Sequence, residues 1–160
     1  MPTKPAVKPN EQSNDADSVW TDEEKAAARA AAAERKAASK RSPADERAAG
    51  LQDLKDAIAK MPADDRAMAE RVHAVVTAAV PSLAPKTYYG MPAYAREGKD
   101  GKVIAFFKPK SKFKVRYSTF GFQPDASLDD GDMWPTEFAV INLTPRTEAQ
   151  IADLVKKAAG

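Results

Sequence analysis

The chain has 160 residues, 43% of them hydrophobic and 8% aromatic, with a net charge of +2, which suits one globular domain with length left for a tail. The absence of cysteine excludes disulfides, thiolate nucleophiles and cysteine-ligated zinc or iron–sulfur sites. No apolar run approaches the ~20 residues of a membrane-spanning helix, and residues 1–15 lack a signal-peptide core, so we expect a soluble, cytoplasmic protein that does not enter a membrane.

The N-terminal part of the chain has little to bury. Residues 1–19 are polar and contain prolines, which predicts a disordered tail. Thr21 followed by Glu24 is the pattern of a capping box and predicts a helix that runs to about Lys40. This helix contains alanines and charged residues but no large apolar side chain, so we expect residues 20–41 to form an exposed helical arm. An arm that binds a partner is the alternative.

Two further helical patterns follow the arm. Ser42 and Pro43 are typical of a helix start, and residues 42–61 are predicted to form a linker with a short helix. Its apolar stripe recurs at helical spacing and consists of Leu51, Leu54, Ile58 and Met61. A clearer helix is predicted over residues 63–80, between Pro62 and Pro81.

After Pro85 the hydrophobic period changes from helical to alternating, which indicates strands. The predicted strands cover residues 87–89, 93–95, 102–108, 112–119 and 138–143, and a C-terminal helix follows Thr144. The run 102–108 is apolar on both faces, as a central strand is. This order predicts an α+β fold with two layers, in which one antiparallel sheet is flanked by N- and C-terminal helices.

One string in this region resembles a known family. It is Tyr89-Gly90-Met91-Pro92-Ala93-Tyr94, with Val80-Pro81 before it and Ile104-Ala105-Phe106-Phe107 after it. The string resembles the YdhG-like family, small bacterial proteins described as a domain of unknown function, over roughly residues 63–158. The resemblance implies a two-layer α+β domain, which we place at residues 62–160. Some members are described as frataxin-like intracellular iron chaperones, which implies iron as the cargo and an iron-receiving protein as the partner.

An acidic loop is the candidate metal site. Asp125, Asp129, Asp130 and Asp132 lie close together in the sequence. Oxygen ligands suit hard cations such as iron(III), calcium or magnesium. The alternative is a solvated turn, because aspartate and glycine are ordinary turn residues and the calcium-loop spacing is absent.

A basic strand pair is the candidate anion site. If residues 112–119 form a strand, Lys108, Lys112, Lys114 and Arg116 share one face of the sheet. Such a face could bind nucleic acid or an acidic protein. The aromatic residues between them should point to the opposite face, which disfavours stacking on bases and therefore nucleic acid. A solvated sheet face is the alternative.

The family-like string itself could line a ligand pocket with Tyr89, Met91, Pro92 and Tyr94, or these residues could be core. The single histidine, His73, is expected on the flank of a helix. No nucleophile elbow, phosphate-binding loop or dinucleotide-binding glycine pattern occurs. We therefore expect a binding protein without catalytic residues. Its predicted ligand is iron, an anionic partner or a small molecule.

Overall fold

The computed structural model describes residues 20–39, 42–98 and 101–160. The predicted tail at residues 1–19 lies outside this range. The helices are α1 (Asp22–Ser39), α2 (Pro43–Ala59), α3 (Ala63–Ala79), α4 (Lys110–Phe113) and α5 (Pro145–Ala159). The strands are β1 (Ala84–Tyr88), β2 (Met91–Ala95), β3 (Val103–Lys108), β4 (Ser118–Phe122) and β5 (Glu137–Val140).

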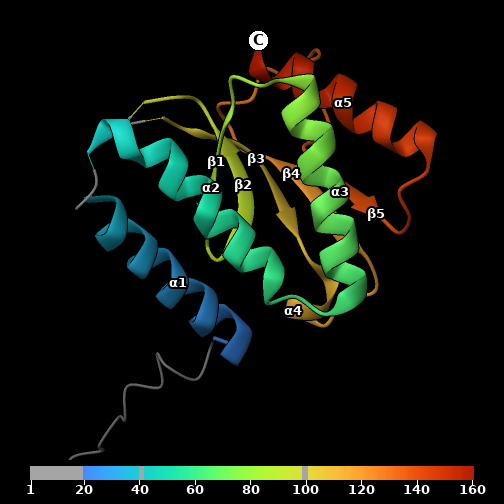
Figure 1. Ribbon diagram of the computed structural model, residues 1–160. Coiled ribbons are helices and arrows are strands. Elements are labelled where there is room, and N and C mark those ends of the chain that lie inside the picture. The colour runs from blue at the N-terminus through green and yellow to red at the C-terminus, as the bar shows by residue number, and fades with distance from the viewer. Residues whose placement is uncertain (1–19, 40–41, 99–100) are drawn as a thin grey trace, which may run out of the picture.

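The strands form one sheet in the order β1-β2-β3-β4-β5, and each neighbouring pair is antiparallel. Strand β3 is central, as its two-sided apolar pattern predicts. Helices α2, α3 and α5 pack on one face of the sheet, and α1 lies outside α2 on the β1 side (Figure 1). The predicted two-layer α+β fold is confirmed.

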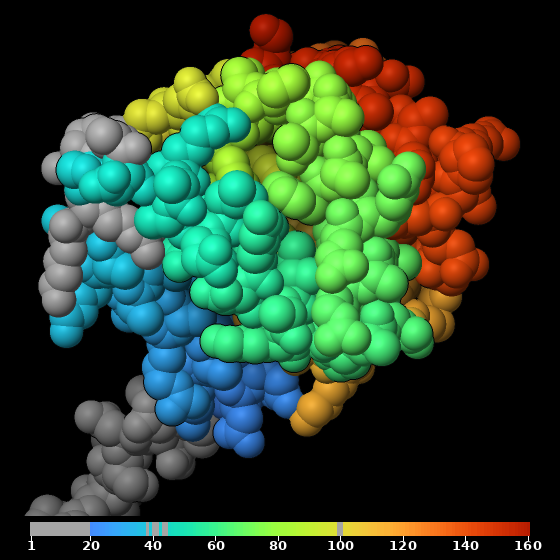
Figure 2. All heavy atoms as spheres, in the orientation of Figure 1, coloured from blue at the N-terminus to red at the C-terminus, as the bar shows by residue number. Residues whose placement is uncertain are grey.

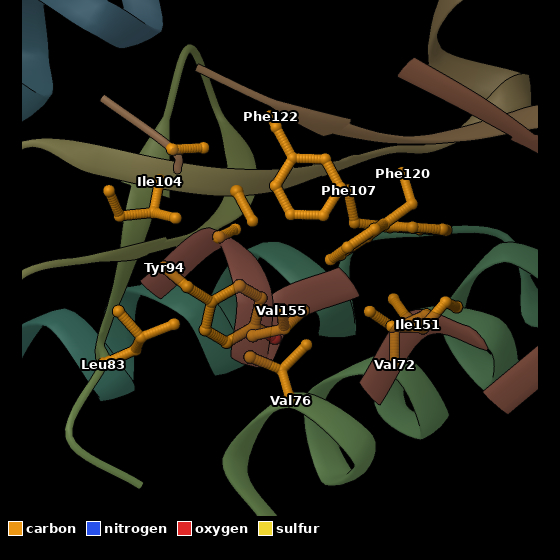
Figure 3. Packing of buried hydrophobic residues seen from close by; sticks show 14 of the residues in the cluster. Val72, Val76, Leu83, Tyr94, Ile104, Phe107, Phe120, Phe122, Ile151 and Val155 are labelled. Atoms are coloured by element: carbon orange, nitrogen blue, oxygen red, sulfur yellow. The ribbon is translucent and has the colours of Figure 1, made fainter. Parts of the chain in front are cut away.

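The main core fills the space between the sheet and these three helices. Aromatic rings from the sheet meet aliphatic side chains from the helices, as Figure 3 shows for Tyr94, Phe107 and Phe120 against Val76 and Val155. All five side chains are at most 2% exposed. Because α2 contributes the fully buried Leu54 to this cluster, the folded unit begins before residue 62, where the sequence placed it.

Helix α2 lies close against β1 because of Gly50. A side chain at this position would meet the Pro85 carbonyl oxygen at 2.3 Å, so only glycine allows the helix and strand to approach this closely. A glycine inside a helix ordinarily weakens it. The structure gives Gly50 a packing reason.

The predicted strand at residues 112–119 is wrong. Residues 109–117 connect β3 to β4, so only Ser118 and Thr119 of the predicted segment lie in a strand, and Lys108 pairs with Thr119 in the ladder. Within this connection α4 forms a single helical turn, which ends at Lys114 in the left-handed conformation (φ 53°). The buried Asp65 carboxylate accepts a hydrogen bond from the Ser111 backbone N–H at 3.2 Å. This contact from α3 favours the helical turn over an extended strand, and no local pattern could reveal it.

Helix α1 docks onto the domain through small residues. The predicted capping box is present: the Glu24 N–H donates to Thr21 Oγ1 at 3.1 Å, and the Thr21 N–H donates to the Glu24 carboxylate at 2.9 Å. Ala27 and Ala31 are only 8% and 5% exposed, although the sequence predicts an exposed arm. Figure 2 shows α1, in blue, packed beside α2 on one side of the molecule. Alanines allow this approach because they have almost no side chain to displace.

Within the described ranges, no helix combines the length and the apolar character needed to cross a bilayer.

Candidate functional site

The turn between β1 and β2 has an unusual backbone. Tyr89 and Gly90 are its two central residues, and both have positive φ, 51° and 76°. Two consecutive positive values are typical of a type I′ turn, which matches the twist of a two-residue hairpin. Successive N–H groups in such turns can point to the same side and form a concave site for an anion.

An anion occupies this turn. The Glu34 carboxylate, from α1, accepts the Tyr89 N–H at 3.1 Å and the Gly90 N–H at 2.7 Å, one on each oxygen. The contact spans more than fifty residues of sequence, so it is a tertiary interaction and not a local cap. Hydrogen bonds to a charged acceptor are stronger than neutral ones. The turn is therefore an anion site filled by a side chain of the same protein.

Lys112 supplies a positive charge beside the turn. Its ammonium donates to the Tyr89 carbonyl oxygen at 2.9 Å, which fixes the side chain against the hairpin. Burial lowers the pKa of Lys112, and the nearby Glu34 carboxylate partly restores it. A half-buried ammonium near two backbone donors favours a carboxylate or a phosphate group over a neutral ligand.

Two clefts lie on either side of α1 at this point. The first, of about 550 Å³, lies between α1, α2 and the β1–β2 hairpin. The second, of about 670 Å³, lies between α1, α2 and the short helix α4, which carries Lys112. Both are lined by Glu34, Asp53 and Thr87, so this part of α1 is the wall between them. The anion site thus opens on space large enough for the rest of a ligand.

A second ionic contact fastens the start of α1. Glu23 pairs with Lys114, and this hydrogen bond is the main reason that the pKa of Glu23 is lowered and that of Lys114 is raised. The Lys114 side chain is exposed and the Glu23 side chain is partly buried, so solvent still screens the pair and its contribution to stability is small.

His73 of α3 and Tyr94 of β2 form a separate polar pair between this helix and the sheet. His73 Nδ1 lies 3.0 Å from the Tyr94 hydroxyl oxygen, and the rings stack with centroids 5.9 Å apart. Burial raises the pKa of Tyr94. Burial, followed by the charge of Lys55, lowers that of His73. The histidine thus serves as the hydrogen-bond partner that a buried tyrosine needs. The sequence predicted a histidine on a helix flank but not this partner.

The predicted basic residues do not share a sheet face. Only Lys108 belongs to a strand, and its ammonium lies 4.5 Å from the centroid of the Phe113 ring. Arg116 lies over the Tyr117 ring, and Lys114 pairs with Glu23. Of the four, only Lys112 lines one of the two clefts described above, the larger one. The anion site therefore contains one predicted basic residue and two backbone N–H groups that no charge count reveals.

The four predicted pocket residues also separate. Met91 packs into a small cluster with Ala93 and Phe106, whereas Tyr94 belongs to the main core. Pro92 is buried within β2, opposite Thr87 of β1. Only Tyr89 lines one of the two clefts. Alternation along β2 explains this result, because adjacent side chains of a strand point to opposite faces.

The acidic loop is anchored by its apolar residues. Ala126 and Leu128 are buried in the main core, and Gly131 turns the chain at φ 67°. The four aspartates of the loop are all exposed, namely Asp125, Asp129, Asp130 and Asp132. In the part of the chain that the structure describes, no three histidine, cysteine, aspartate or glutamate residues are grouped so that they could hold a metal ion. Among the ion pairs of the described residues, none joins an aspartate of this loop to one of the predicted basic residues.

Glu34 is the site residue that sequence reasoning missed. It lies in an alanine-rich helix among other charged residues, and nothing local distinguishes it. The sequence placed strands at residues 87–89 and 93–95, and therefore the connection at residues 90–92. The turn instead consists of Tyr89 and Gly90, and β2 begins at Met91.

Comparison with known proteins gives no relative, since no family model, curated protein or solved structure matches the chain at a significant level.

Proposed function

We propose that this chain is a non-catalytic binding protein that recognises an anionic group, a carboxylate or a phosphate, at the β1–β2 turn. The Tyr89 and Gly90 N–H groups bind the anion, and the Lys112 ammonium supplies the charge. The rest of the ligand lies along the clefts beside α2. The observation that carries this proposal is the Glu34 carboxylate held by both N–H groups.

The chemistry of the site suits binding better than catalysis. Backbone N–H groups neither titrate nor transfer a proton at neutral pH, so they recognise charge without taking part in acid–base steps. The described residues around the turn include no histidine, and His73 is engaged by Tyr94. The protein has no cysteine to act as a nucleophile.

Iron handling stays a prediction that rests on the resemblance to the YdhG-like family. Its predicted ligands, Asp125, Asp129, Asp130 and Asp132, are all exposed side chains. A calorimetric titration with iron(II) under anaerobic conditions tests it, with magnesium and zinc as controls. Saturable, iron-selective binding that is lost in Asp129→Asn/Asp130→Asn/Asp132→Asn would support the iron prediction.

The anion proposal is tested in the full chain by removing the internal carboxylate. In a Glu34→Ala variant the turn is free to bind an added anion. Titration with inorganic phosphate, and separately with acetate, should shift the amide resonances of Tyr89 and Gly90 in a saturable way in ¹H–¹⁵N spectra. The two arms show whether the site prefers a phosphate or a carboxylate.

A second substitution tests the role of the lysine. Adding Lys112→Ala to Glu34→Ala should weaken anion binding by roughly fivefold or more, because the site then loses the ammonium that lies against the turn. Lys156→Ala in the same background is the matched control, since Lys156 is exposed on α5. If neither anion shifts the Tyr89 and Gly90 resonances of the Glu34→Ala protein, the proposal is wrong.

A further inference from the structure

Helix α1 contacts the domain along one face that has a simple pattern. Glu23, Ala27, Ala31 and Glu34 follow each other at spacings of four, four and three residues, which places them on one side of a helix. The two alanines are buried, and the two glutamates bind Lys114 and the β1–β2 turn. At 1.5 Å per residue, the two carboxylates lie roughly 16 Å apart along the helix axis.

This face makes few apolar contacts. No leucine, isoleucine, valine, methionine or aromatic residue occurs between Asp22 and Ser39. The clefts of about 550 and 670 Å³ remain on both sides of the helix, so α1 does not fill the groove in which it lies. Since Glu34 is part of the wall between the clefts, displacement of α1 would join them into one groove along α2 and β1.

The groove therefore selects a type of helix by charge and size. It offers a positive charge at one end and an anion site at the other, and the two side chains buried between them are alanines. These features complement any helix with two carboxylates three turns apart and small residues between. They do not depend on that helix belonging to the same chain.

We infer that α1 is an internal substitute for an acidic, alanine-rich helix of a partner protein, and that it blocks the groove until this helix displaces it. The inference rests on the proposed function, because the partner's carboxylate would bind the same Tyr89 and Gly90 N–H groups. To that proposal the inference adds the class of partner, an acidic helix, and a way to regulate its binding, since α1 blocks the groove. Weak docking of α1 suits this role, since an internal competitor must be removable.

The test uses the full chain and a peptide with the sequence of residues 20–39, labelled with a fluorophore. Glu23→Gln/Glu34→Gln weakens the docking of the chain's own helix and leaves the groove intact. Fluorescence anisotropy should show the peptide binding to this variant at least tenfold more tightly than to the wild-type chain. Glu70→Gln/Glu137→Gln is the control for charge, because both residues are exposed and lie outside the clefts; it should bind the peptide as the wild type does.

A second peptide, with glutamine at the positions of both glutamates, separates charge recognition from helix packing. It should bind the double variant at least tenfold more weakly than the natural peptide does. The inference is overturned if the natural peptide binds all chains equally, or binds none, while phosphate or acetate still shifts the Tyr89 and Gly90 resonances of Glu34→Ala. If phosphate and acetate also leave these resonances unchanged, the proposed function is wrong as well as the inference.

Discussion

The two sides of α2 are built in different ways. Between α2 and α5 the sheet is covered by interlocking aromatic and aliphatic side chains, and Phe107, Phe120 and Val155 have no exposed surface. On its other side lies α1, whose two carboxylates bind Lys114 and the β1–β2 turn and whose two alanines are buried between them. Burial of large side chains is the main source of folding free energy, whereas exposed ion pairs add little.

This difference separates stability from recognition within one small protein. The core side can keep the sheet folded whether or not α1 is in place. The α1 side holds a charged group against backbone donors with little apolar area, which is an arrangement that can open without unfolding the sheet. Substitutions on the two sides should therefore have effects of different size and kind.

Phe107→Ala should have the largest effect. It removes a fully buried ring from the centre of β3, and such truncations cost about 3–5 kcal/mol of unfolding free energy. Urea denaturation followed by circular dichroism measures this loss. Glu34→Gln, measured alongside, should cost only about 1 kcal/mol, because the amide oxygen can still accept one of the two N–H groups and the other can turn to solvent at the exposed hairpin. Equal losses in the two proteins would contradict the comparison.

Gly90→Ala should have an intermediate effect, about 1–3 kcal/mol. Gly90 has positive φ, and an added methyl group would lie 2.6 Å from the Lys112 nitrogen and 3.3 Å from the Ala30 side chain. The alanine therefore strains the turn and pushes against both the lysine and α1.

Gly131→Ala is the matched control for this substitution. Gly131 also has positive φ (67°), but nothing lies within 4 Å of an added methyl group. Its cost should be limited to the backbone strain, about 1 kcal/mol. If Gly90→Ala and Gly131→Ala have the same urea midpoint, the contacts of the added methyl group with Lys112 and Ala30 cost no measurable stability.

His73 should produce the smallest effect, a dependence of stability on pH. Burial lowers its pKa below the ordinary value of 6.5, so below this pH the unfolded chain binds more protons than the folded one. Its contribution to stability is therefore complete above pH 6.5 and decreases as the pH falls through the lowered value. In His73→Gln, which can still hydrogen-bond to the Tyr94 hydroxyl, the urea midpoint should fall less between about pH 7.5 and 5.5. If the urea midpoint falls equally in the wild type and in His73→Gln, His73 is not the cause of this pH dependence.

Much of the core side could be predicted from the sequence, because its signals are local. The apolar period that places Val72 and Val76 on one face of α3, and the two-sided apolar run of β3, both correspond to elements of the structure. Thr144 caps α5 by accepting the Thr147 N–H at 3.2 Å, next to the predicted helix start. These features depend on neighbours within a few residues.

The α1 side could not be predicted in the same way. Alternation over residues 112–119 indicated a strand, but the Asp65 contact to Ser111 and the left-handed Lys114 turn this segment into a short helix and a loop. Glu34 and its turn are far apart in the sequence, and their contact depends on the final position of α1. The candidate site is made of backbone N–H groups, which every residue except proline has, so no composition or motif marks it.

Native-state hydrogen exchange tests the central claim most directly, because it measures the opening of α1 separately from the opening of the sheet. The account predicts that the amides of α1, together with those of Tyr89 and Gly90, exchange at least ~100-fold faster than the ladder amides of Phe107 and Phe120, through an opening that leaves the sheet intact. If the α1 amides are protected as strongly as those of β3 and β4, helix α1 is a permanent part of the core, and the anion site is not available to a partner.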